Sequence, residues 1–474
     1  MNQLNHPDNR NRDLSSRRQL RRLVLMLAIP IIAENLLLSM MEYVDTAMVG
    51  SLGPNATAAV ACVTPVIWVL NSMIIAVGVG GTVVAAQSIG AGDYDRARKT
   101  CGQAFLAAAA MALFITALLL GFRHKIPVFM GVEPDIYPIA SSYILFLALG
   151  MPMHCTSAVF YGILRGAGDT RTPLVLSLCT NIMNIIGNFL LIFPERMVTL
   201  GSLSFHMWGA GLGVAGASIS SSFARTVSGL IVLVIMTQRH DVTLKLRGLK
   251  PEWPLLTEIL KIGLPAALEK LAINGGHVMY ARLVAGLGTV VQAAHQLAQT
   301  AETICFLPAM GFETAATTLA GQSVGAKQYE EGRRRVSMTV ELCICCVMIM
   351  AAILFIGCRF LLGLLTPSEA VITQGAIALR TIAVFEIAYG ITAVFAGGLR
   401  GVGATREPFY ICLGSMWLLR IPLALFLLNF MNGGIGAVWL AMGLDLVLRA
   451  ILMGYRFHRG SWEQKLRKGE LKDD

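Results

Sequence analysis

The sequence predicts an all-α integral membrane protein with twelve transmembrane helices, arranged as two six-helix bundles related by an internal repeat. Three observations support this fold class: 55% of the 474 residues are hydrophobic and 14% are charged, long apolar stretches recur along the chain, and blocks of sequence return at one fixed offset. A soluble domain carries roughly 25% charged residues, so a soluble protein with a single core is excluded.

Twelve apolar stretches are long enough to cross a hydrocarbon core of about 30 Å as helices. The polar and basic residues before the first stretch have no apolar core and no cleavage site, so we expect a tail rather than a secretory signal peptide. The predicted spans are 23–49, 56–80, 101–121, 136–162, 173–193, 209–237, 258–284, 290–318, 336–357, 371–396, 408–430 and 434–456.

The net charge of the chain, +10 at pH 7, follows the loops. Most of the 38 Lys and Arg residues lie in the two tails and in the loops on the side of the N-terminus, whereas the outer loops hold Arg123, Lys125, Arg196 and Arg359. This asymmetry is the positive-inside pattern, which predicts that both termini are cytoplasmic. The basic excess therefore needs no nucleic-acid partner.

Metal and nucleotide chemistry find no support in the motifs. The ten Cys residues include no CxxC pair and no His at zinc-site spacing, so we expect them to pack in apolar spans, as at Cys343, Cys345 and Cys346. No Gly-rich loop ends in Lys-Ser or Lys-Thr, so the sequence predicts no direct use of ATP. We expect no resident metal and no cofactor.

An internal repeat divides the chain. Segment Gln87–Ala91 returns as Gln322–Ala326, and segment Leu164–Gly168 returns as Leu399–Gly403, each 235 residues later. Because this offset spans six helices, both halves enter the membrane with the same orientation, which defines a parallel repeat. Further residues that return at the same offset are Pro30, Glu34, Leu52 and Gly53, as Pro265, Glu269, Leu287 and Gly288.

The repeat sets the expected domain organisation. Two six-helix lobes joined by a cytoplasmic linker suit alternating access around a central cavity. We expect the basic linker, which includes Arg247, to contain a short surface helix. The predicted segments are an N-terminal tail 1–22, an N-lobe 23–237, a linker 238–257, a C-lobe 258–456 and a C-terminal tail 457–474.

The repeated loops lie on the cytoplasmic side and have a structural interpretation. Glycines permit tight turns after long helices, and arginines can bond helix-end carbonyls and the headgroups of membrane lipids. The glycines are Gly90, Gly92, Gly166 and Gly168, and the arginines are Arg165, Arg171, Arg400 and Arg406.

Carboxylates inside the predicted spans are the candidates for chemistry, because ionisable groups are costly in hydrocarbon. A carboxylate that faces a cavity accepts a proton, a sodium ion or an organic cation, and their competition couples transport. Buried ion pairs with Lys270, Arg282 or Arg380 are the competing interpretation. The candidate acids are Glu34, Glu42, Asp45, Glu269, Glu302, Glu313 and Glu386. We interpret His154, His277 and His295 as hydrogen-bonded structural residues.

The chain resembles the multidrug and toxin extrusion (MATE) family of exporters, NorM-like members of the MOP superfamily, over nearly its whole length. The resemblance implies a V-shaped pair of six-helix lobes that exchanges sodium ions or protons for cationic, amphipathic drugs. The segments that carry it are Val44–Gly50, Gln87–Gly92, Leu164–Pro173, Gly263–Glu269 and Ala293–Gln296.

The resemblance implies candidate coupling residues in both lobes. Asp45 matches the family's first-helix aspartate, and Asn184, Asn188 and Ser221 match the residues that complete its cation or proton site. Asn188 occupies the position where those members carry an acid, so the sequence favours a coupling site in the C-lobe. There NorM-like members place acids on helices 7 and 10, the helices that carry Glu269 and Glu386, although Glu269 falls about one turn early and Glu386 about three residues early.

We expect a secondary active exporter of small organic cations or drugs, coupled to Na+ or H+, and not an enzyme. We expect a monomer in the bacterial inner membrane. A lipid-linked saccharide flippase is the first alternative, because Arg225, Arg282, Arg380, Arg420 and Arg449 lie in or near spans. A membrane enzyme is the second, but Glu195 and His206 in the longest outer loop lack catalytic partners at useful spacing.

Overall fold

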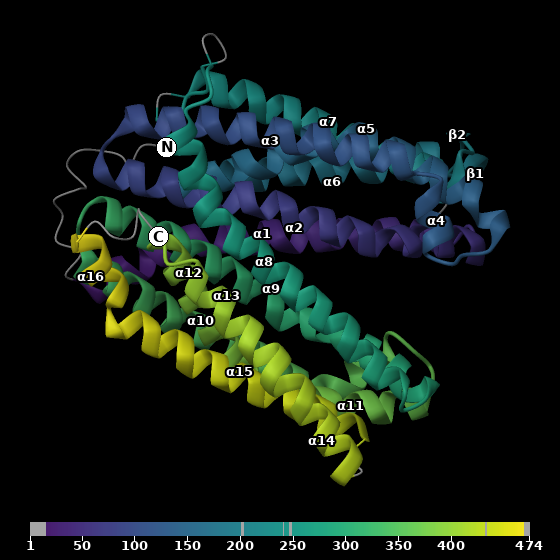
Figure 1. Cartoon of the computed structure of the whole chain (residues 1–474). Helices are drawn as coiled ribbons and strands as arrows, with labels where there is room; N and C mark the ends of the chain where they lie inside the picture. The colour runs from purple at the N-terminus through teal and green to yellow at the C-terminus, as the bar shows by residue number, and fades with distance from the viewer. Residues whose placement is uncertain (1–15, 201–202, 240, 246–248, 432–433, 469–474) are drawn as a thin grey trace. The chain divides into compact units, whose positions relative to one another are not determined.

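A computed structural model describes residues 16–200, 203–239, 241–245, 249–431 and 434–468 (Figure 1). Contacts divide the chain into two compact units. We call Ala33–Ala85 with Tyr94–Leu260 the N-terminal unit, and Met1–Ile32, Ala86–Asp93 and Lys261–Asp474 the C-terminal unit. The expected tails 1–22 and 457–474 lie partly outside the described residues, as does Arg247 of the expected linker.

Long helices of the first half build most of the N-terminal unit, where α5 packs between α3 and α7, and α7 also packs against α6. Their shared core is apolar and includes Ile115, Leu119 and Ile144. The elements are α1 (Arg17–Gly50), α2 (Pro54–Ala91), α3 (Tyr94–Phe122), α4 (Lys125–Phe129), η2 (Pro134–Ile136), α5 (Tyr137–Gly166), α6 (Arg171–Leu191) and α7 (Gly213–Gln238).

The C-terminal unit has α9 at its centre, in contact with α10, α11 and α12, while α12 also packs against α15. The first turns of α1 join its core, where Leu27 and Ile31 pack with Phe312. Its elements are α8 (Trp253–Ala285), α9 (Thr289–Gly325), α10 (Tyr329–Gly363), α11 (Glu369–Ala383), α12 (Glu386–Gly401), α13 (Arg406–Gly414), the π-helical segment η3 (Ser415–Arg420), α14 (Ile421–Met431), α15 (Gly434–Arg459) and α16 (Ser461–Lys468).

Each predicted span coincides with a long helix or with consecutive helices. Among the described residues, nine helices are long and apolar enough to cross a membrane, and ten if α11 and α12, bent by 53°, form one broken span. The predicted spans 258–284 and 290–318 correspond to α8 and α9, whose acids and bases, among them Lys270 and Glu313, lower their mean hydropathy. The structure thus confirms a multi-pass helical membrane protein.

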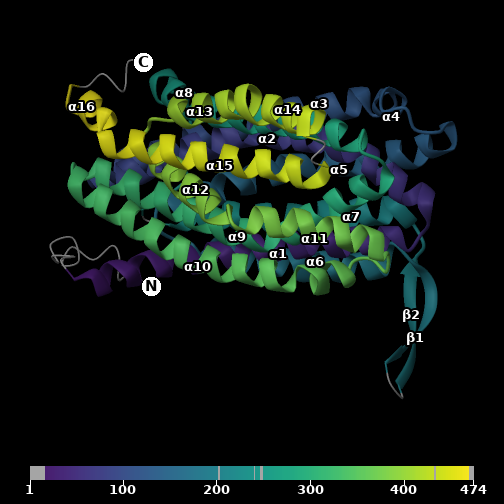
Figure 2. The ribbon, with the colours of Figure 1, turned by 90° about the horizontal axis from the view of Figure 1, so that it is seen from below.

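Two local features differ from expectation. The longest outer loop forms an antiparallel hairpin of β1 (Pro194–Leu200) and β2 (Leu203–Ala210), which projects beyond the ends of α6 and α7 in Figure 2. The hairpin delays the start of α7 to Gly213, four residues after the predicted start of the span. The predicted surface helix of the linker is wrong for the described residues between α7 and α8, which are irregular.

The repeated loops follow the expected turn geometry in part. Gly92 and Gly168 adopt positive φ angles of 75° and 87°, as a tight turn after a helix requires. Gly90 and Gly166 instead lie inside helices, so the predicted turn role is wrong for them. A Cβ atom at Gly90 would overlap the backbone of Gln322, and one at Gly166 the backbone of Thr82, so both glycines permit close helix packing.

Candidate functional site

An acid–arginine pair occurs once in each half at the repeat offset. In the N-terminal unit, Arg165 donates from Nη2 and Nε to Glu34, at 2.5 and 3.2 Å. In the C-terminal unit, Arg400 Nη2 contacts both carboxylate oxygens of Glu269, at 2.8 and 3.0 Å. Both arginines thus neutralise buried carboxylates, a role that the sequence analysis did not predict for them.

Glu34 and Glu269 are 0% and 2% exposed, and the ion-pair interpretation raised for the second-half acids is confirmed for Glu269. The partner of Glu269 is the repeated-loop arginine, Arg400, rather than the Lys270 that follows it in sequence. A role for either acid in ion coupling stays a prediction. Removing one partner of such a buried pair leaves an uncompensated charge and is strongly destabilising.

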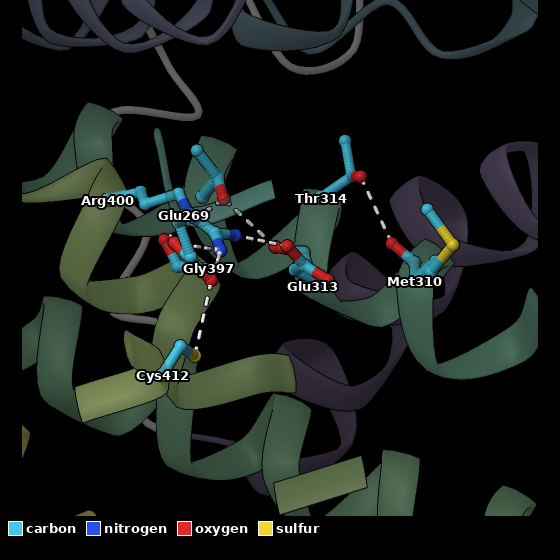
Figure 3. Close-up of polar contacts among 8 residues, drawn as sticks. Glu269, Met310, Glu313, Thr314, Gly397, Arg400 and Cys412 are labelled. Carbon is cyan, nitrogen blue, oxygen red and sulfur yellow. Dashed lines mark hydrogen bonds and ion pairs between the residues drawn. The ribbon is translucent and has the colours of Figure 1, made fainter. Parts of the chain in front are cut away.

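The C-terminal unit adds a second acid to its pair (Figure 3). Arg400 Nη1 also bonds Glu313 of α9, and the thiol of Cys412 donates to Glu269 Oε1 at 3.5 Å. Figure 3 shows the two carboxylates approaching the guanidinium from different sides. In the first half the position of Glu313 is Gly78, so the second acid belongs to the second half alone.

The four residues expected at the N-lobe site come together in the N-terminal unit. Asn188 Nδ2 donates to Asp45 Oδ1, and Ser221 Oγ donates to Asp45 Oδ2 at 3.1 Å. Asn184 Nδ2 in turn donates to Ser221 Oγ at 2.9 Å. Donors aimed at both oxygens stabilise Asp45 as an anion. Glu42 is exposed and lies within electrostatic range of Asp45 and Arg225.

A pair of acids lies in the C-terminal unit, where α11 and α12 meet at their bend. Glu386 is the first residue of α12 and is 1% exposed. Its side chain hydrogen-bonds to Glu302 of α9, and its Oε1 has no hydrogen-bond donor among the described residues. Ionised carboxylates only accept hydrogen bonds, so a bond between two of them requires a proton on one.

The repeat shows that packing does not require this acid pair. The positions of Glu302 and Glu386 in the first half are Ile67 and Met151. Both belong to an apolar cluster in the N-terminal unit, where Met151 is 1% exposed. The second half therefore carries two carboxyl groups where the first half is filled by hydrocarbon.

The C-terminal unit holds further buried polar side chains. His295 Nδ1 accepts a hydrogen bond from Trp439 Nε1 at 3.1 Å, which confirms the structural interpretation of this histidine. Asp445 pairs with Arg449 at 2.7 Å. Arg420 lies within electrostatic range of Glu302. The sequence analysis considered Arg420 only for a flippase, because its distance in sequence from Glu302 gives no sign that the two side chains interact.

Comparison with known proteins identifies the same two halves. A family model described as MatE matches residues 30–190 and 265–426, two segments whose starts are 235 residues apart. Similar curated proteins include a probable multidrug resistance protein NorM of Thermotoga maritima, 29% identical over 449 residues and 94% of both chains. The multidrug resistance protein MdtK of Photorhabdus laumondii is 27% identical over 459 residues, 94% of this chain and 96% of its own.

Solved structures share the fold. A multidrug resistance MATE family transporter of the MOP superfamily in an outward-facing conformation has a TM-score of 0.85 at 20% identity, covering 94% of this chain and 96% of its own. A MOP superfamily transporter from Pyrococcus furiosus gives the same TM-score and identity, covering 94% and 97%. Since the MatE model matches both halves and well over half of the chain, this protein belongs to the MatE family of membrane transporters.

Proposed function

We propose that this protein is a secondary active multidrug exporter, which releases cationic or amphipathic small molecules in exchange for protons by alternating access. Family membership makes it a transporter rather than an enzyme. Its relatives named as multidrug resistance proteins support the substrate class. The observation that carries the choice of proton is the hydrogen-bonded carboxyl pair of Glu302 and Glu386.

The pair supplies a coupling mechanism. With one shared proton, the two carboxyl groups carry a single negative charge and bond each other. Without the proton, two adjacent buried carboxylates repel strongly, and an organic cation between them relieves the repulsion. The proton and the cation therefore exclude each other, which is the requirement for antiport. Protonation from outside then releases the substrate.

The position of Glu386 suits this exchange. It is the first residue of α12, at the 53° bend between α11 and α12. Broken helices of this kind form ion and substrate sites in many transporters. The partial positive charge of a helix N-terminus stabilises a carboxylate that has given up its proton.

Asp45 is the second candidate coupling residue, favoured by the donors from Asn188 and Ser221 that meet its carboxylate. A sodium ion would need oxygen ligands rather than the hydrogen-bond donors that meet this carboxylate. Asn188 Oδ1 is buried without a donor among the described residues, but Asn188 supplies no second negative charge. This set thus supports a proton or an organic cation better than Na+.

The bacterial relatives support the inner membrane as the location, and the excess of Lys and Arg in the predicted inner loops supports cytoplasmic termini. We propose that the protein works as a monomer, because each half contains its own candidate coupling acids.

Transport in proteoliposomes tests the proposal. The purified protein would be given a fluorescent organic cation, with proton and sodium gradients imposed separately. We expect transport to follow the proton gradient and to be lost in Glu386→Gln and Glu302→Gln. Glu330→Gln, an exposed acid at the start of α10, is the matched control. Transport driven only by sodium would refute proton coupling, and no gradient-driven transport of several cations would favour the flippase.

A further inference from the structure

Arg420 is a buried cation at an unusual point of the backbone. It is the last residue of η3, a π-helical segment between α13 and α14, and it is 4% exposed. Single π turns within helices are rare and frequently lie at functional sites. The guanidinium carbon of Arg420 lies 4.3 Å from the ring centroid of Tyr280, so an aromatic face holds the charge where an acid would be expected.

One edge of this guanidinium is buried without a hydrogen-bond partner among the described residues. This edge carries Nε and Nη2 of Arg420. These two N–H groups point along the same edge of the planar group, which matches the two oxygens of a carboxylate. Arg165 uses the same two atoms to hold Glu34. The same donors at Arg420 therefore form an unfilled carboxylate fork.

The acids near Arg420 are engaged with other partners. Asp445 pairs with Arg449, whose Nε also donates to Ser415 Oγ at 2.7 Å. Glu302 lies in electrostatic range of Arg420 but hydrogen-bonds to Glu386. The repeat position in the first half is Ile185, so helix packing does not require a cation here. Among the described residues, Tyr280 and the more distant Glu302 stabilise the charge of Arg420, and no carboxylate forms an ion pair with it.

We infer that the Nε–Nη2 edge of Arg420 is a binding site for the carboxylate of a zwitterionic substrate. Glu302 lies within electrostatic range of Arg420 and forms the carboxyl pair with Glu386. Arg420, which lacks a carboxylate partner among the described residues, therefore lies within electrostatic range of the carboxyl pair of Glu302 and Glu386. This arrangement of charges complements a small molecule that carries both a carboxylate and an ammonium group. Its ammonium group replaces the shared proton. This inference rests on the proposed function, because the carboxylate belongs to a transported molecule.

A matched pair of substrates tests the site. One is a cationic xanthene dye with a free carboxylate, and the other is the methyl ester of the same dye. Proton-driven transport and equilibrium binding of both would be measured for wild type, Arg420→Gln, Arg420→Lys and Arg380→Gln. Arg380 is an exposed arginine of α11 and serves as the control. Thermal unfolding in detergent identifies any variant that fails to fold.

We expect Arg420→Gln to lose transport and binding of the free acid by about ten-fold or more, because a charge-assisted pair is removed, while the ester is unaffected. Arg420→Lys keeps the charge but lacks the fork, so it should lose part of the preference. If Arg420→Gln lost transport and binding of both dyes equally, Arg420 would be the counter-ion of Glu302 and the proposed site would be refuted. Unchanged transport and binding of the free-acid dye would also refute it. Failure of wild type with both dyes would instead refute the proposed exporter.

Discussion

The two units place their buried acids in opposite surroundings. Asp45 receives hydrogen bonds from Asn188 and Ser221, which stabilise its anion. Oε1 of Glu386 receives no donor from the described residues, and the carboxyl group lies beside that of Glu302. The first arrangement surrounds a carboxylate with hydrogen-bond donors, whereas the second places two carboxyl groups side by side. The halves of one repeat thus share a fold but differ in the chemistry that their carboxylates can perform.

The scaffold of the repeat explains how this divergence is tolerated. Each half keeps the same acid–arginine pair, Glu34 with Arg165 and Glu269 with Arg400. Several candidate functional positions differ between the halves: Asp45 corresponds to Tyr280, and Arg420 to Ile185. The conserved pair therefore supports the helices, and the varied positions carry function. Each prediction below tests one side of this division.

The largest effect is expected from giving the second half the side chains of the first. The double variant Glu302→Ile/Glu386→Met copies Ile67 and Met151. We expect proton-driven efflux to fall by about 100-fold, because the coupling groups are gone. Stability in detergent should stay equal or rise, since apolar groups replace a buried polar pair. Efflux assays and thermal unfolding check both results. A variant that transports normally would show that the acid pair is not the coupling site.

A large stability effect is expected at the scaffold pairs. Arg400→Met leaves both Glu269 and Glu313 without their cation, so we expect a loss of roughly 3–5 kcal/mol in unfolding free energy. Arg165→Met leaves only Glu34 without its cation, so the loss in unfolding free energy should be smaller. The arginines are 7% and 20% exposed, which points the same way. Denaturant unfolding in detergent compares the two. Equal losses of unfolding free energy would mean that the ion pair between Glu313 and Arg400 contributes nothing to stability.

A smaller, pH-dependent effect on stability is expected at Asp169, in the loop that follows α5. Burial tends to raise the pKa of Asp169, but hydrogen bonds from Thr172 and the ion pair with Arg239 at 2.7 Å outweigh it, so the pKa is lowered. The stability it contributes is present above about pH 4, the pKa of an unfolded Asp, and is lost as the pH falls through the lower folded pKa.

Asp169→Asn should therefore cost about 1 kcal/mol at neutral pH and have little further effect in acid. The matching loop of the second half has Ala404 at this position, so its substitution by Ser provides a control without a titrating group. Thermal unfolding between about pH 7 and pH 3 is the measurement. If wild type and Asp169→Asn lost stability in parallel on acidification, the carboxylate would not be the source of the pH dependence.

The smallest effect is expected at the turn that follows α2 and α9. Gly92 has a φ of 75°, and its repeat partner Lys327 has a φ of 60°. A side chain in this left-handed region costs about 1–2 kcal/mol, so Lys327→Gly should stabilise the protein and Gly92→Lys should destabilise it by similar amounts. Opposite shifts in the unfolding temperature are expected. Shifts of the same sign would show that the lysine side chain makes a compensating contact.

Apolar length, loop charge and the repeat offset predicted the helices, because each depends only on residues close in sequence or on self-similarity. The N-lobe set of Asp45, Asn184, Asn188 and Ser221 was predicted through the family resemblance, and the structure brings these side chains together. The acid pair was predicted as two separate acids. That Glu302 meets Glu386 depends on how α9 packs against the bend, which no local pattern encodes.

Proton release on substrate binding tests the central claim most directly. The purified protein in weakly buffered detergent would be mixed with an organic cation while a pH indicator is followed. We predict release of about one proton per bound cation in wild type, because one proton is shared by Glu302 and Glu386. The Glu302→Gln/Glu386→Gln variant should release none. Cation binding without proton release in wild type, or equal release by the variant, would contradict the account.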